Sequence, residues 1–235
     1  MSSNGTFKWS GEKDVTKAEI PCDYSSIGEN AFLECSSLTN ITIPNSITEI
    51  GERAFSFCSS LTNIAIPDSV SEIGSYAFYE CSSLTNITIP SSVTKIVNDT
   101  FSGCSSLTNI TIPNTITEIG SYAFERCSSL TNIVIPNSVS FIGEYAFYEC
   151  TSLTNITIPN GVTEINNSAF SNCSSLTNIS IPNSVTSISY FAFRECSSLT
   201  KAYVPSIFKN IKNVFPKNCK LEEQILNNQN IIDNF

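Results

Sequence analysis

The stretch CSSLTNITIPNSITEIGERAFSF, residues 35–57, is one unit of an internal repeat that is 23 residues long. The unit recurs without insertion or deletion, so cysteine, leucine and phenylalanine each return at that spacing. The cysteine column contains Cys35, Cys58, Cys81, Cys104, Cys127, Cys150, Cys173, Cys196 and Cys219. The leucine column runs from Leu38 to Leu199 and the phenylalanine column from Phe32 to Phe193, both with the same spacing of 23 residues. A fixed period of this size is the signature of a solenoid, in which each unit forms one coil.

The order of apolar residues within the unit predicts the course of one coil. Ile41 and Ile43 alternate with the outward Thr42, which is typical of a half-buried strand, and a proline then ends the strand because it has no N–H for the ladder. A second short extended segment should end at Ile50, followed by a glycine corner. The remaining residues favour a helical or 3₁₀ turn with Phe55 reaching into the centre of the coil. Stacked coils then bury a common core, as parallel β-ladders in a right-handed coil stack.

The run Leu-x-x-Ile-x-Ile-Pro, followed by Ile-Gly-x-x-Ala-Phe-x-x-Cys, resembles the leucine-rich repeats of the BspA-like family, also called the Treponema pallidum type. The resemblance covers about residues 13–218. It implies a leucine-rich repeat solenoid. It also implies a surface-associated adhesion, antigen or interaction protein of a bacterium or parasitic protist, and no enzyme.

Three regions are expected along the chain. Residues 1–11 should form an N-terminal cap that uses Phe7 and Trp9, and residues 12–218 should form about nine coils, the last of them degraded because Pro216 stands in the phenylalanine column. Residues 219–235 should form a C-terminal cap and tail, with a short helix over 221–226 and a frayed Asn-rich end over 227–235.

Composition excludes several classes of function. The net charge is −9 and no basic stripe exists, so nucleic acid is not an expected partner. The chain has no histidine, no nucleophile elbow and no phosphate loop, so we expect no catalytic site, no metal and no cofactor. No apolar run is long enough to span a membrane, and the polar first ten residues predict no secretory signal. By these criteria the chain is cytoplasmic, whereas the family resemblance implies the cell surface.

The cysteine column is expected to be a ladder of buried free thiols that act as small hydrophobes and weak donors to backbone carbonyls. Nine thiols in a row on one side of the coil cannot all pair with their neighbours, and no C-x-x-C pair supports zinc. Cys22 is out of register and is expected at the surface.

A threonine column and an asparagine column are nearly invariant and are expected to form side-chain ladders that hold the coils in register. The same columns would present a flat, repetitive surface to a repetitive ligand. Many of these asparagines lie in N-x-[ST] sequons, at Asn40, Asn86, Asn109, Asn155 and Asn178, with further sequons at Asn4, Asn98, Asn166 and Asn172. Glycans on successive coils about 5 Å apart would collide, so full occupancy is not expected.

Variation between units is confined to a few columns, which makes them candidates for specific binding. The candidate binding residues are Tyr76, Tyr79, Tyr122, Phe141, Tyr145, Tyr148, Glu49, Glu72, Glu118 and Glu164. Exposed tyrosines are enriched at recognition surfaces, although the same residues would also suit packing over the phenylalanine column. The preferred hypothesis is a non-enzymatic module that binds a protein or glycan. The alternative is a self-assembling or repetitive-surface-binding protein that uses the threonine and asparagine ladders.

Overall fold

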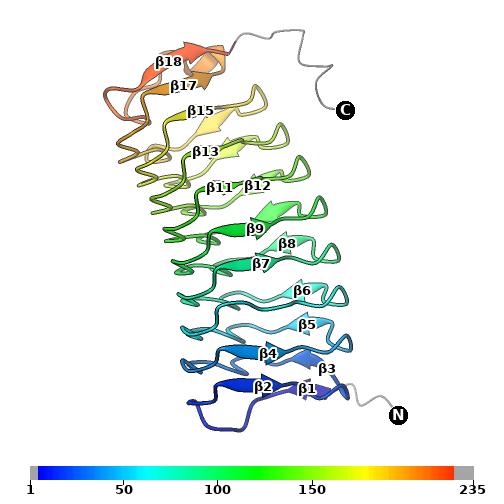
Figure 1. Cartoon of the computed structure of the whole chain (residues 1–235). Coiled ribbons are helices and arrows are strands. Elements are labelled where there is room, and N and C mark those ends of the chain that lie inside the picture. Colours follow the sequence, from blue (N-terminus) through cyan, green and yellow to red (C-terminus); the bar gives the residue numbers. More distant parts are fainter. Residues whose placement is uncertain (1–4, 225–235) are drawn as a thin grey trace.

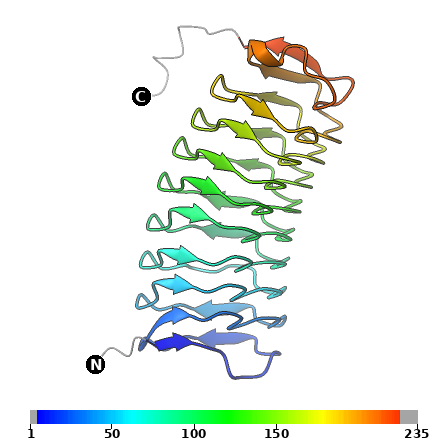
Figure 2. The same ribbon diagram turned by 180° about the vertical axis from the view of Figure 1, so that it is seen from behind.

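The computed structural model describes residues 5–224, which form a stack of parallel coils with a strand on each of two sides (Figures 1 and 2). The first side carries β2 (Lys17–Glu19), β4 (Asn40–Thr42), β7 (Asn86–Thr88), β9 (Asn109–Thr111), β11 (Asn132–Ile133), β13 (Asn155–Ile156), β15 (Asn178–Ser180), β17 (Lys201–Val204) and β18 (Lys220–Glu223). The second side carries β1 (Gly5–Phe7), β3 (Tyr24–Ile27), β5 (Glu49–Ile50), β6 (Glu72–Ile73), β8 (Lys95–Ile96), β10 (Glu118–Ile119), β12 (Phe141–Ile142), β14 (Glu164–Ile165) and β16 (Ser187–Ile188). The predicted coil stack with parallel ladders is confirmed.

Equivalent residues of successive coils pair with one another, so the sequence period is also the register of the ladders. Ile50 pairs with Ile73, and Asn86 pairs with Asn109, all in parallel. The isoleucines of the strands face the core while asparagine and threonine face outward, as in β4, where Ile41 is buried between two exposed residues. This alternation is the one predicted from the sequence.

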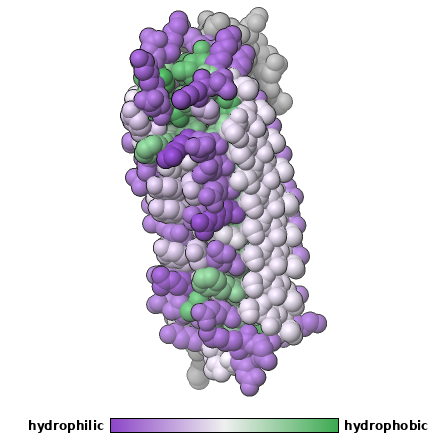
Figure 3. Space-filling model, turned by 90° about the vertical axis from the view of Figure 1, so that its left-hand side faces the viewer, coloured by the Kyte–Doolittle hydropathy of each residue, from purple (hydrophilic) through white to green (hydrophobic). Residues whose placement is uncertain are grey.

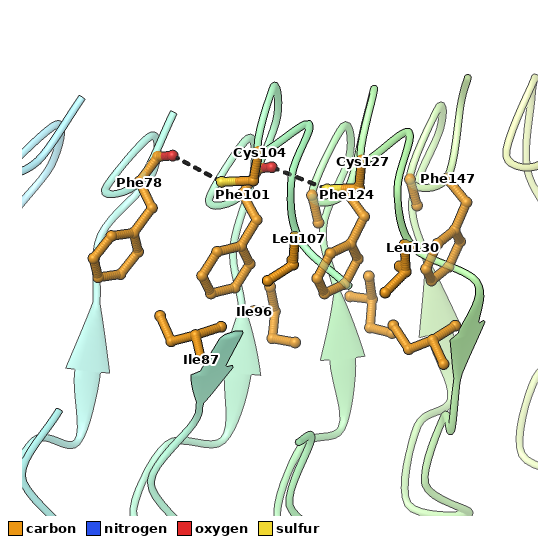
Figure 4. Close-up of a cluster of buried hydrophobic side chains, with 14 of the residues drawn as sticks. Phe78, Ile87, Ile96, Phe101, Cys104, Leu107, Phe124, Cys127, Leu130 and Phe147 are labelled. Atoms are coloured by element: carbon orange, nitrogen blue, oxygen red, sulfur yellow. Dashed lines mark hydrogen bonds between the residues drawn. The ribbon is translucent and has the colours of Figure 1, made fainter. Parts of the chain in front are cut away.

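A column of stacked phenylalanine rings forms the centre of the core (Figure 4). Neighbouring rings are 5.3–5.5 Å apart and tilted by only 3–12°, and they run from Phe32 to Phe193. The cysteines lie beside them. From Cys58 to Cys196, each thiol of the column donates to the carbonyl oxygen of the phenylalanine 26 residues earlier, at 3.0–3.3 Å, as Cys104 does to Phe78 and Cys127 to Phe101. The buried cysteines therefore stack along the core and hold neighbouring coils together.

The segment after each glycine corner is a run of tight turns and contains no helix; the one 3₁₀ helix within residues 5–224 is η1 (Ser206–Phe208). The sequence suggested a helical or 3₁₀ turn here. It does not form because only every second backbone amide donates a hydrogen bond within the turn. Ala54 and Ser56 donate within the turn, to Gly51 and Arg53, whereas Phe55 donates to Ala77 of the next coil at 2.8 Å. A helix would use every amide internally and would leave the coils unlinked on this side.

The two ends of the stack extend the aromatic column with residues from outside the repeat. Trp9 and Phe7 both stack on Phe32, at 5.5 and 5.7 Å. At the other end Phe215 stacks on Phe193 at 5.0 Å, so the prediction that Pro216 takes this position is wrong by one residue. The larger flat ring matches the column better than the proline does.

The predicted helix at residues 221–226 is also wrong where the structure describes it, because Lys220–Glu223 form the strand β18. This strand pairs in parallel with β17, and Lys201 lies opposite Lys220. The open edge of β17 offers backbone donors and acceptors that a strand satisfies and a helix does not. The predicted frayed end, residues 227–235, lies outside the described residues.

Candidate binding surface

Each coil has a third side, made by the tight turns, which we call the turn side; after the corner at Gly51 it comprises residues 52–60, and it comprises the equivalent residues in the other coils. Figure 3 shows this side, where even, pale columns run beside an uneven strip of hydrophilic and hydrophobic residues. The even columns are the repeated serines and threonines, and the uneven strip holds the variable positions. Side-chain variety is therefore concentrated on one side of the solenoid.

The invariant threonines and the asparagines beside them lie on the first side, where all are exposed except the half-buried Thr85 and Thr154. Thr85 and Thr108 each donate to the carbonyl of the equivalent threonine one coil earlier, at 3.2 Å. The asparagine amides mostly donate to the neighbouring threonine hydroxyl of the same coil, at 3.1–3.5 Å. Within residues 5–224, one asparagine pair links two coils, Asn109 to Asn86 at 3.3 Å. The threonines thus connect coils regularly, while a continuous asparagine ladder does not form.

Two positions of the turns have a backbone with positive φ, although Phe191, at the first position of its turn, does not. The first carries Asn30, Arg53, Tyr76, Asp99, Tyr122, Tyr145 and Ser168, with φ of 53–58°. The second carries Glu34, Phe57, Glu80, Gly103, Arg126, Glu149, Asn172 and Glu195, with φ of 56–76°. Left-handed backbone is uncommon for residues other than glycine, so the inter-coil hydrogen bonds of the turns impose it. Tyr76, Tyr122 and Tyr145 all belong to the first set.

The tyrosines predicted as binding residues form two groups on the turn side. In the first, Tyr79 makes edge contacts with Tyr76 at 5.6 Å and with Phe57 at 5.3 Å. In the second, Tyr122 and Tyr145 stack in parallel at 4.8 Å. Tyr148 then meets the edge of Tyr145 at 5.5 Å. All five tyrosines are half-buried, so each combines packing with an exposed edge.

Charged groups lie among these rings and raise the pKa of several tyrosines. Asp99 raises the pKa of Tyr76 by its charge, and Arg53 lies over the Tyr76 ring at 4.9 Å. A hydrogen bond to Glu149 raises the pKa of Tyr148. Arg126 in turn pairs with Glu149 at 3.2 Å. The phenols of Tyr76 and Tyr148 are therefore harder to ionise than an exposed tyrosine.

The predicted acidic residues lie elsewhere, on the second side, and the structure does not bring them together with the tyrosines. Glu49 pairs in register with Glu72, and Glu118 lies between Lys95 and Phe141 in the next sheet along this side. Lys95 and Glu118 form an ion pair of 2.8 Å. Glu164 and Phe141 are both exposed on this second side.

Sequence reasoning missed several residues of the turn side. Phe57, Tyr190 and Phe191 are among the large apolar side chains that remain exposed, at 44%, 60% and 43%. Arg194 lies over the Phe191 ring at 5.4 Å. Phe57 could have been found from the sequence, because it is the one aromatic residue in a column that elsewhere is often glutamate. Tyr190 could have been found in the same way, because the other residues of its column, from Glu29 to Asn167, are all polar or charged.

The described residues show neither a metal site nor a membrane span. Among residues 5–224, no group of three or more histidine, cysteine, aspartate or glutamate side chains could hold a metal ion. Over the same residues, no helix is long and apolar enough to cross a membrane. The cysteines are all free, and burial raises the pKa of thiols such as Cys104, so they stay neutral. Cys22 is exposed, as predicted.

The family of this chain follows from its match to a family model. The model for the BspA type leucine rich repeat region matches residues 3–131 and 117–234. The chain belongs to this family, as its repeat predicted. Leucine-rich repeat proteins of this kind generally mediate protein binding or surface interactions and are generally non-enzymatic scaffolds. Among curated protein sequences, none matches the chain significantly.

Solved structures of bacterial leucine-rich repeat proteins are similar to this chain. The leucine-rich repeat protein of T. pallidum is 24% identical, with a TM-score of 0.58 over 91% of this chain and 90% of that one. The pneumococcal vaccine antigen PcpA is 20% identical, with a TM-score of 0.55 over 91% and 69%. These two structures show the same fold. A leucine rich cell surface protein of Faecalibacterium prausnitzii is 28% identical, with a TM-score of 0.46 over 89% and 80%.

Proposed function

We propose that the chain is a non-enzymatic binding module of the adhesion or scaffold kind, which engages a protein or glycan partner with its turn side. One observation carries the proposal: the aromatic groups around Tyr79 and Tyr145 lie on the side where the coils differ. An invariant column presents the same chemistry at every coil, whereas the turn side presents a distinct sequence of rings and charges. Large, rigid aromatic side chains supply contact area at a modest cost in conformational entropy.

The charge of the turn side indicates what surrounds the contact on the partner. Between residues 29 and 198, carboxylates outnumber cations on this side: Glu29, Glu34, Glu52, Glu80, Asp99, Glu125, Glu144, Glu149 and Glu195 against Arg53, Arg126 and Arg194. A partner with a basic rim would complement this surface and associate faster at low salt. A location at the cell surface, to which the family resemblance points, belongs to the same proposal.

The test compares two double variants of the intact chain. A partner is captured on the wild-type chain and identified, and its dissociation constant is then measured by titration. Tyr145→Ala with Tyr148→Ala should weaken binding by about 1–3 kcal/mol, the usual size for interface aromatics. Thr108→Ala with Thr131→Ala, on the first side, is the matched control and should leave the affinity unchanged. Circular dichroism and the thermal midpoint report whether both variants keep the fold.

The second candidate function is recognition of a repetitive ligand by the first side. It is favoured by the even spacing of exposed threonines and by the link between Asn86 and Asn109. The reverse result in the same experiment supports it: binding lost in the threonine variant and retained in the tyrosine variant. That result would contradict the preferred function.

A further inference from the structure

The row of large side chains on the turn side is interrupted at one coil. At the position that holds Tyr122 and Tyr145 in the two preceding coils, the next coil has Ser168, which has positive φ like them. Three residues later that coil has Ser171, where Tyr148 stands one coil earlier. Phe191 follows at the first position in the coil after it. The chain thus forms a notch between Tyr145 and Phe191, which we call the Ser168 notch.

The walls and floor of the Ser168 notch are well defined. Tyr145 and Tyr148 line one wall and Phe191 and Arg194 the other, while Ser168 and Ser171 form the floor, and the volume is about 370 Å³. Both serines are buried, 6% and 3% exposed. The edge contact between Tyr145 and Tyr148, at 5.5 Å, holds the first wall in place.

The width of the notch fits one flat ring. Core rings of successive coils here are 5.3–5.4 Å apart, so side chains two coils apart are separated by about twice that distance. A ring placed midway lies about 5 Å from each wall, within the range of 4.5–7 Å for stacked aromatic centroids. The Tyr122–Tyr145 stack, at 4.8 Å, already shows this arrangement one step along the same row. A ring in the notch would continue that row.

The floor offers one uncommitted polar group. The Ser168 hydroxyl makes no hydrogen bond to another side chain or to the backbone within residues 5–224, and it is not among the polar atoms sealed from solvent, because it opens into the notch. The Ser171 hydroxyl already donates to the Arg194 carbonyl at 3.1 Å. An occupant of the notch can therefore take the place of solvent as the partner of the Ser168 hydroxyl. Asn172 and Glu195 line the notch as well, and a phenol carries a single hydroxyl, for which Ser168 at the floor is the partner.

We propose that the Ser168 notch receives a tyrosine side chain from a protein partner. The ring stacks between Tyr145 and Phe191, and the phenol oxygen forms a hydrogen bond with the Ser168 hydroxyl. This inference rests on the proposed function, since it makes the turn side the binding side and names the anchor that the partner supplies. It differs from that function in locating the anchor at a single coil.

The test uses the intact chain and a small probe, so it needs no partner. N-acetyl-L-tyrosinamide is titrated into the ¹⁵N-labelled protein, and amide shifts are followed by NMR. Shifts at Ser168, Ser171 and Asn172 should saturate with a dissociation constant on the order of 1 mM, as expected for so small a ligand. N-acetyl-L-phenylalaninamide should bind several-fold more weakly because it lacks the phenol oxygen. N-acetyl-L-alaninamide and methyl α-glucopyranoside should cause no shift there.

Two variants of Ser168 make the assignment specific. Ser168→Tyr fills the notch with the residue that the row carries at Tyr145, and it should abolish the shifts in a folded protein. Ser168→Ala leaves the notch open and should reduce the affinity for the tyrosine probe to that for the phenylalanine probe. Thr108→Ala, on the first side, should bind as the wild type does.

Several outcomes would contradict the proposal that the notch binds a tyrosine side chain. They are undiminished binding by Ser168→Tyr, an unchanged preference for tyrosine in Ser168→Ala, a stronger response to the glucoside, or no response to any probe. If the probe fails while Tyr145→Ala with Tyr148→Ala still weakens partner binding, the notch is wrong and the proposed function stands. If the probe binds while that double variant leaves partner binding unchanged, the proposed function is wrong. The proposal that the notch receives a side chain of the partner is then wrong as well.

Discussion

Single residues on the turn side adopt a backbone conformation that their type does not favour. Arg53, Tyr76 and Glu80 have φ of 53–58°, and of the two columns only Gly103 is a glycine. For an L-residue this conformation costs about 1–2 kcal/mol. The cost persists because the amides of this segment alternate between the turn and the next coil. The residues in these two columns are therefore strained, whereas Tyr79 and Tyr148 in the third variable column are not.

Glu80→Gly should relieve this strain, and Glu80→Ala is its matched control. Both variants remove the same carboxylate, but alanine keeps a Cβ at φ of 56°. The glycine variant should be more stable than the alanine variant by about 0.5–1 kcal/mol, which is the relief of strain less the larger unfolded-state entropy of glycine. Urea unfolding at neutral pH measures the difference. A glycine variant less stable than the alanine variant would show that the turn imposes no strain here.

Among the elements, the glycine corner decides how closely two coils approach. A Cβ on Gly51, Gly74, Gly120 or Gly143 would lie 2.4–2.7 Å from atoms of the preceding coil. The second-side ladder breaks twice, between β6 and β8 and between β12 and β14. Each break precedes a coil in which a larger residue, Val97 or Asn166, replaces the glycine, whereas the small Ser189 leaves β14 paired with β16. A bulky side chain at the corner thus separates the strands on that side.

Gly143→Ala should therefore destabilise the chain and open the ladder between β10 and β12. Its Cβ would lie 2.4 Å from the Ser121 amide nitrogen, and backbone atoms cannot rotate away as a side-chain tip can. We expect a loss of about 1–3 kcal/mol in the free energy of unfolding, typical of overpacking. The amide of Ile142 should also exchange faster with D₂O.

Gly161→Ala is the control for this change, because its Cβ would lie 3.0 Å from its nearest neighbour, the Val139 carbonyl oxygen. It should lose less stability than Gly143→Ala. Equal losses in the two variants would mean that close approach at the corner is unimportant.

For the whole molecule, the repeated thiols make stability depend on pH. Burial raises the pKa of Cys58, Cys81, Cys104, Cys127 and Cys150 in the folded chain, each far above its ordinary value. Below about pH 8.5 both folded and unfolded chains keep these protons, so the thiols add no dependence on pH there. Above it the unfolded chain releases protons that the folded chain retains. The free energy of unfolding therefore falls as pH rises.

We predict a steep alkaline loss of stability, with each buried thiol adding about 1.4 kcal/mol per pH unit above its unfolded pKa. Urea unfolding under reducing conditions, at pH 7, 9 and 10, measures the slope. Cys104→Ala should make it shallower by the share of one thiol, whereas Cys22→Ala, at an exposed position, should leave it unchanged. An identical slope in wild type and Cys104→Ala would show that this thiol ionises as easily in the folded chain as in the unfolded one.

The coil, its strands, the buried columns and the family all follow from the repeat, because a strict period places the same apolar residue against its copy in every neighbouring coil. Contacts of this kind depend only on spacing. Leu38 and Cys58 could therefore be assigned to the core from their places in the repeat, and both are fully buried.

Where the repeat is broken or faces solvent, the amino-acid order is not enough, and the packing of the folded chain determines the result. At those places the structure depends on which unlike side chains of neighbouring coils come into contact. The spacing of the repeat does not determine these contacts. Phe215 displaces Pro216 from the aromatic column because a flat ring continues the stack. The tyrosines and the glutamate column are separated because the glycine corner places them on different sides of the coil. Ser168 forms a notch because its neighbours on either side, two coils apart from each other, are both large aromatic residues.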